Sequence, residues 1–86
     1  MHEMISIQTR YYFNLVSAAG TVHDYEGTEL SSIEHARREA IEDAKGLMSA
    51  AILEGRDISA RSIEICNEEG EVLLTIAFRD AIMPDA

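Results

Sequence analysis

The chain has 86 residues, of which 47% are hydrophobic and 27% charged, a composition typical of one small soluble domain and unlike that of a disordered segment or a disulfide scaffold. Sixteen acidic and seven basic side chains give a formal net charge of -9, which repels phosphate backbones and anionic lipids and argues against nucleic-acid and membrane binding. Cys66 is the only cysteine and the N-terminus lacks the basic start and apolar run of a signal peptide, so we expect a cytoplasmic protein without disulfides.

The first predicted element is a strand over residues 10–16, RYYFNLV. Apolar side chains occupy odd positions, namely Ile5, Ile7, Tyr11, Phe13 and Leu15, and polar side chains alternate with them. A period of two is typical of a strand with one face in the core and one in water. Residues 1–9 either extend this strand or fray.

A turn over residues 17–20 and a second strand follow. The run TVHDYE, residues 21–26, is short and is expected to pair back on the first strand. It stops at Gly27.

The period then changes, and a long amphipathic helix is predicted over residues 32–54. Apolar side chains recur at intervals of three and four: Ile33, Ala36, Ala40, Ile41, Ala44, Leu47, Met48, Ala51 and Ile52. Ser31 and Glu34 fit the S-x-x-E capping box at the start, and Gly55 fits a left-handed cap at the end. Gly46 inside the helix costs up to about 1 kcal/mol unless close packing requires it.

The remaining chain predicts a hairpin around the N-E-E-G run. A three-residue loop, 68–70, would set Ile63 and Ile65 beside Leu73 and Thr75. A four-residue loop, 67–70, would set Ile65 against Val72 and Ile63 against Leu74, and it is preferred because it brings apolar residues together. In this loop Gly70 takes the positive φ.

These elements predict one domain over residues 1–86, a two-layer α+β fold of ββαββ order with a four-stranded antiparallel sheet. One helix covers only one face of such a sheet. The opposite face is the candidate interface, with Tyr12, Val16, Leu73, Thr75 and Ala77 as its residues. The alternative is that these are ordinary scattered surface side chains.

Residues 23–37, HDYEGTELSSIEHAR, hold the densest group of polar side chains. Its possible metal ligands are His23, Asp24, Glu26, Glu29 and His35. Zinc prefers tighter His or Cys spacing, and calcium needs a fuller set of oxygens than this fragment offers. A turn followed by a helix cap accounts for most of the same residues, so we expect no metal and no other cofactor.

Arg37 falls within the apolar stripe when the helix is projected at 100° per residue. A charged group there needs a partner at the edge of the two layers. We expect a structural ion pair between Arg37 and the acidic run, with Asp24 as first choice and Glu29 as an alternative.

Catalytic interpretations have less support. Cys66 precedes a tight turn and no histidine follows His35, so a Cys–His pair is not expected. Glu68, Glu69 and Glu71 lie at a loop tip where water screens them. No phosphate-binding glycine loop or nucleophile elbow occurs, and the sequence does not predict an enzyme.

Four segments, RYYFNL, DYEGTEL, IEHARREA and GEVLLTIAFRDA, together resemble a family of short uncharacterised alpha-proteobacterial proteins. The resemblance covers residues 10–82, and Met1 to Thr9 is additional to it. It implies a small cytoplasmic domain of unknown function without assigned catalytic residues.

Residues 11–54 are also similar, more faintly, to the N-terminal domain of HicB-type antitoxins. That family continues into a DNA-binding segment, which is not found here. This similarity implies an acidic module that neutralises a basic protein.

The function that the sequence favours is a noncatalytic protein–protein interaction module that self-associates, most simply as a homodimer. The alternative is an antitoxin-like acidic protein that binds a basic partner protein.

Overall fold

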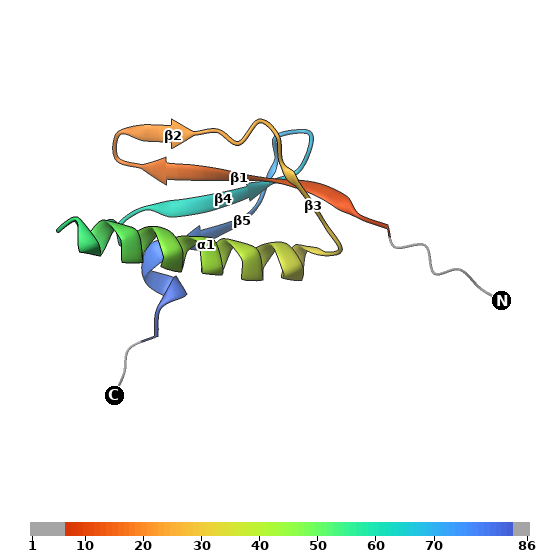
Figure 1. Cartoon of the computed structure of the whole chain (residues 1–86). Helices are drawn as coiled ribbons and strands as arrows, with labels where there is room; N and C mark the ends of the chain where they lie inside the picture. Colours follow the sequence, from red (N-terminus) through yellow and green to blue (C-terminus); the bar gives the residue numbers. More distant parts are fainter. Residues whose placement is uncertain (1–6, 84–86) are drawn as a thin grey trace.

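The computed structural model describes residues 7–83 (Figure 1). Its elements, in chain order, are β1 (Thr9–Ser17), β2 (Gly20–Val22), β3 (Thr28–Leu30), α1 (Ile33–Leu53), β4 (Ser62–Cys66), β5 (Val72–Ala77) and the short 3-10 helix η1 (Phe78–Ala81). The predicted α+β class, the antiparallel sheet and the single long helix are confirmed. Ile5, which was assigned to the first strand, lies outside the described residues.

The sheet has five strands in place of the four predicted, because the second strand ends at Val22 and a further strand, β3, forms at residues 28–30, where none was predicted. The order is β2-β1-β4-β5, and β3 also pairs with β1. Leu15 lies opposite Val22, whereas Thr9 lies opposite Leu30. Residues 23–27 loop out between the two short strands, so only Thr21 and Val22 of the TVHDYE run are in a strand.

The hairpin between β4 and β5 has a register that neither predicted loop gives by itself. At its tip, Gly70 has a φ of 81° and Asn67 N–H donates to the Glu71 carbonyl at 3.0 Å. Cys66 lies opposite Val72, but Ile65 lies opposite Leu74, so Leu73 is an additional residue in β5. The preferred four-residue loop was therefore wrong. This bulge keeps Leu74 and Ile76 on the same face as Ile65 and Ile63, and that face is the core.

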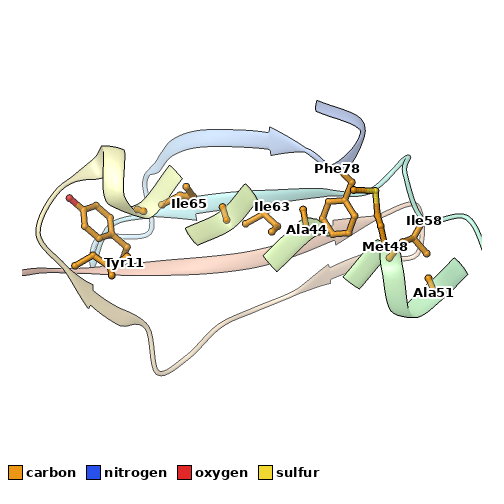
Figure 2. Close-up of a cluster of buried hydrophobic side chains, with 11 residues drawn as sticks. Tyr11, Ala44, Met48, Ala51, Ile58, Ile63, Ile65 and Phe78 are labelled. Atoms are coloured by element: carbon orange, nitrogen blue, oxygen red, sulfur yellow. The ribbon is translucent and has the colours of Figure 1, made fainter. Parts of the chain in front are cut away.

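The helix lies on one face of the sheet (Figure 1). Its buried positions are mostly small, namely Ala36, Ala40, Ala44, Met48 and Ala51. Small side chains let the helix lie close to the strands, and the larger core volume comes from Ile63, Ile65 and Phe78. Figure 2 shows this core extending from Tyr11 at one end to Ile58 and Ala51 at the other.

The two ends of α1 differ in how well they were predicted. The N-cap is Ser32, whose hydroxyl oxygen accepts from His35 N–H at 3.1 Å, so the Ser31 and Glu34 capping box was wrong by one residue. At the other end, Gly55 has a φ of 78° and donates to the Ile52 carbonyl, while Arg56 N–H donates to the Ala51 carbonyl. This pair of bonds is a Schellman motif with Gly55 in the predicted position.

The helix covers only part of the sheet face on which it lies. It packs on β4, β5 and the end of β3, and not over β2. A helix is about 10 Å wide and strands are spaced by about 4.8 Å, so one helix spans roughly two strands. Phe13 and Leu15 of β1 are consequently only half-buried, and Val22 of β2 is 68% exposed.

Candidate functional site

The acidic segment at residues 23–29 consists of the loop that divides β2 from β3, residues 23–27, and the first two residues of β3. The Asp24 carboxylate accepts three backbone N–H groups, from Phe13 at 3.1 Å, Glu26 at 3.2 Å and Gly27 at 3.0 Å. The Asp24 carboxylate therefore takes the place of the backbone carbonyl that would otherwise accept the Phe13 N–H of β1. Gly27 closes the loop with a φ of 70°.

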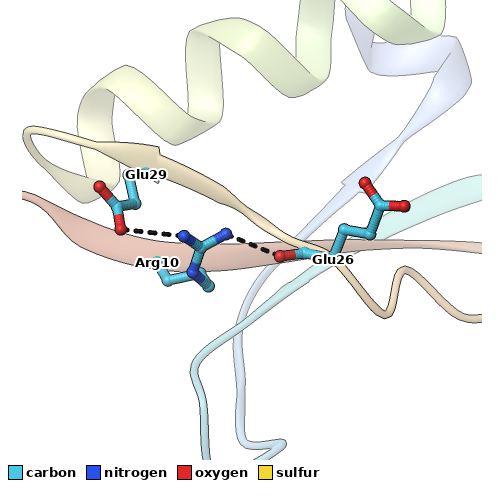
Figure 3. A network of polar contacts seen from close by, with 3 residues as sticks. All are labelled: Arg10, Glu26 and Glu29. Carbon is cyan, nitrogen blue, oxygen red and sulfur yellow. Dashed lines mark hydrogen bonds and ion pairs between the residues drawn. The ribbon is translucent and has the colours of Figure 1, made fainter.

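The cation that pairs with this segment is Arg10, and the prediction that it would be Arg37 was wrong. Arg10 Nη2 lies 2.9 Å from Glu29 Oε1, and its Nη1 donates to the Glu26 carbonyl at 2.7 Å (Figure 3). Arg10 and Glu29 are directly opposite each other across β1 and β3.

Arg37 is exposed, and its Nε lies 3.5 Å from Glu34 Oε1 on the same helix. The physical reason is that the alanines at 36 and 40 contact the sheet along a narrow stripe that leaves position 37 outside. The Asp24 carboxylate, moreover, is already taken by backbone donors.

The two histidines of the segment have separate environments. His35 Nδ1 lies 3.3 Å from Ser31 Oγ and its Nε2 lies 3.6 Å from Glu39 Oε1, whereas the His23 ring lies against Tyr25 with centroids 6.0 Å apart. Within residues 7–83, no three His, Cys, Asp or Glu side chains converge on a point that could hold a metal ion.

A shallow hollow of about 190 Å³ lies on the sheet face opposite the helix. Asn14 and Cys66 lie in it, and both are buried, at 9% and 4% exposure. The Asn14 amide donates to Cys66 Sγ at 3.5 Å, and its oxygen accepts from Asp24 N–H at 2.9 Å. Tyr12, His23 and Tyr25 contribute to the walls. The sequence does not predict the contact between Asn14 and Cys66, because they are 52 residues apart and it does not give the strand order.

The thiol in this hollow is not activated. Burial raises the pKa of Cys66, and the charge of Glu64 raises it further against a smaller opposing effect of the Asn14 amide. A thiol with a raised pKa is protonated at neutral pH and is a weak nucleophile. His23 lines the same hollow, but the hydrogen-bond partner of Cys66 among the described residues is Asn14.

The residues of the predicted interface come from β1 and β5, which β4 separates in the sheet. Tyr12 and Val16 are half-buried on β1, on the face opposite the helix. Thr75 pairs with Glu64 and Ala77 with Ser62, which places them on the same face. Leu73 is the bulge residue, and Val72 lies opposite Cys66 on this face.

Strand β5 forms one edge of the sheet, and no strand within residues 7–83 pairs with its outer side. Its six residues, VLLTIA, include no charge and no proline. Val72 is 50% exposed and Leu73 is 43% exposed. The opposite edge is formed by the two three-residue strands β2 and β3, which the loop of residues 23–27 separates. Short, interrupted edge strands pair poorly with another chain, whereas an uncharged apolar edge strand such as β5 can pair with one.

A second surface is the groove between α1 and β1, on the helix side of the sheet. Phe13, Leu15, Leu47 and Ile63 form its apolar lining, and Gly46 leaves it open at the helix. Its acidic residues are Glu42 and Asp43. Burial raises the pKa of Asp43, and the neighbouring charge of Glu39 raises it further.

Fold and surfaces together define a small α+β domain with one helix on a five-stranded antiparallel sheet. Residues 10–79 match the model of a protein family described as a domain of unknown function, DUF6894. The chain belongs to this family, which agrees with the resemblance to a family of unknown function.

No match was found among curated proteins or solved structures. Within residues 7–83, no helix is both long enough and apolar enough to cross a bilayer. The alpha-proteobacterial origin and the HicB-type similarity stay predictions.

Proposed function

We propose that this protein is a noncatalytic interaction module that self-associates as a homodimer by pairing the β5 edges of two copies. The observation that carries the proposal is the combination of an uncharged, proline-free edge strand with exposed Val72 and Leu73. Antiparallel pairing of β5 with its symmetry mate is an isologous contact, so it satisfies the open backbone groups of both copies at once.

The face beside β5 supports the same proposal. Tyr12, Val16, Thr75 and Ala77 lie on the helix-free side of the sheet. Asp24 and Glu68 line the hollow on this side, and Arg10 and Glu29 neutralise each other. Within the pairing of β4 with β5 the charged residue on this side is Glu64, so two copies that meet at β5 bring few like charges together.

The test is the molar mass of the full chain in solution over a range of concentrations, by light scattering after size exclusion. Thr75→Lys places a charge on the β5 edge, and the matched control Thr21→Lys places the same charge on the β2 edge. Both threonines are exposed strand residues, paired with Glu64 and Val16 respectively. We expect a dimer that Thr75→Lys dissociates and Thr21→Lys does not. A monomer at every concentration, or equal effects of the two substitutions, would reject the proposal.

A second candidate function is binding of a basic partner protein, as in an antitoxin-like module. The acidic residues of the groove between α1 and β1 favour it, together with the net charge of -9. This function uses the helix side of the sheet, so it is compatible with a dimer formed through β5.

A further inference from the structure

The groove between α1 and β1 has the width of a missing helix. The sheet is about two strands wider than α1 can cover, and two strands at about 4.8 Å spacing match the width of one more helix. The uncovered side chains are apolar: Phe13 and Leu15 are half-buried, Val22 is 68% exposed and Leu47 is 40% exposed. Leaving such a continuous strip in water is unfavourable, at about 25 cal/mol per Å² of apolar surface.

The helix side of this groove permits close approach. A Cβ built on Gly46 meets no heavy atom within 4 Å. Two helices lying side by side on a sheet have axes about 8–10 Å apart, and a small residue at the contact suits the lower end of that range. Gly46, which weakens α1 as an isolated helix, would thus make room for a neighbour.

The charge of the groove indicates whether its occupant is a second copy of this chain or another protein. The charged side chains that line the groove are Glu42 and Asp43, both acidic, and Lys45 contacts Glu42 in an exposed ion pair that contributes little. A second copy of a chain with net charge -9 would add negative charge to this rim. Burial and the neighbouring charge of Glu39 raise the pKa of Asp43, and a cation placed beside its carboxylate would favour the ionised form.

We infer that the groove binds an amphipathic, basic helix of a partner protein, which lies beside α1 and completes the helical layer over β1 and β2. The apolar face of that helix would contact Phe13, Leu15 and Leu47. Its lysines or arginines would lie against Glu42 and Asp43. This inference rests on the second candidate function and names the site at which it takes place.

The experiment uses the full chain and a fluorescently labelled synthetic peptide with leucines on one helical face and lysines on the other, followed by anisotropy. A peptide of equal charge with serine in place of leucine is the control for charge alone. We expect the leucine peptide to bind more tightly than the serine peptide, with an affinity that falls as salt is added.

Two sets of variants locate the site. Gly46→Leu fills the groove without changing the charge, and we expect it to weaken peptide binding about tenfold. Glu42→Gln with Asp43→Asn should weaken binding and flatten its salt dependence. The matched pair Glu68→Gln with Glu69→Gln, which removes equal charge at the hairpin tip, should change it little. Circular dichroism of each variant checks that the fold is kept.

The outcomes separate the site from the function. If the wild-type chain binds neither peptide, the basic-partner function fails. If the wild-type chain binds the leucine peptide and the Gly46→Leu variant binds it as tightly, the basic-partner function stands and the groove is not its site. The same conclusion follows if the two double variants that remove charge, at 42 and 43 and at 68 and 69, lose affinity for the peptide equally.

Discussion

Gly27 is the residue on which the division between β2 and β3 depends most directly. Its φ is 70°, and a Cβ placed on it would lie 2.8 Å from Arg10 Cγ, 2.9 Å from Tyr12 Cε2 and 3.0 Å from the Tyr11 carbonyl. Both the backbone conformation and the available space therefore require glycine. From the sequence Gly27 could be read as the end of a strand, but not as a residue pressed against β1.

We predict that Gly27→Ala destabilises the fold more than Gly55→Ala does. Gly55 also has a positive φ, 78°, but a Cβ there meets nothing within 4 Å. Both substitutions carry the cost of a left-handed alanine, about 1–2 kcal/mol. Only Gly27→Ala adds the cost of overpacking, about 1–3 kcal/mol. Urea denaturation of both variants measures the difference, and equal losses would contradict the packing described at Gly27.

Cys66 gives a second prediction at the level of one residue. Because burial raises the pKa of its thiol, we expect the folded protein to react slowly with a disulfide reagent such as DTNB at neutral pH. The rate should rise with pH and should be much faster in denaturant. Since Cys66 is the only cysteine, the signal has one source. Equal rates for folded and unfolded protein would contradict both the burial and the raised pKa.

At the level of elements, features that depend on neighbouring residues were predicted better than the pairing of strands. The Gly55 cap depends on a few neighbouring residues and was found where expected. At the other end, Ser31 and Ser32 are both capping residues, and the glutamate at 34 favoured the wrong one. The hairpin register depended on the bulge at Leu73, which has no signature in the sequence itself. The packing of the core, and not the loop, determines where that extra residue falls.

The helix provides a prediction at this scale. Gly46→Ala should stabilise the protein by about 0.5–1 kcal/mol, because alanine loses less backbone entropy and the structure has room for its methyl group. For a domain of this size that gain raises Tm by roughly 2–8 °C. Ala50→Gly, at an exposed position of the same helix, should lower Tm by a similar amount. If Gly46→Ala lowers Tm, glycine is required there by packing within the chain itself.

At the level of the whole molecule, contacts between distant segments were out of reach of the sequence. The pairing of β1 with β4 brings Asn14 to Cys66, and the pairing of β1 with β3 brings Arg10 to Glu29. Both follow from a strand order that alternating residues do not encode. The predicted pairing of Arg37 with Asp24 failed for the same reason, since nearness along the chain was used in place of a known arrangement. The fold class, by contrast, followed from the periods of the elements.

The unequal margins of the sheet limit how large an assembly of this chain can become. One margin, β5, is continuous and apolar, while the other is broken into two short pieces by a loop tied down through Asp24. A sheet that can be extended at only one side accepts one neighbour, and joining two such sides leaves none available. If two copies pair through β5, growth would stop at that pair instead of continuing into a fibre, and the exposed apolar strand would be covered in the dimer.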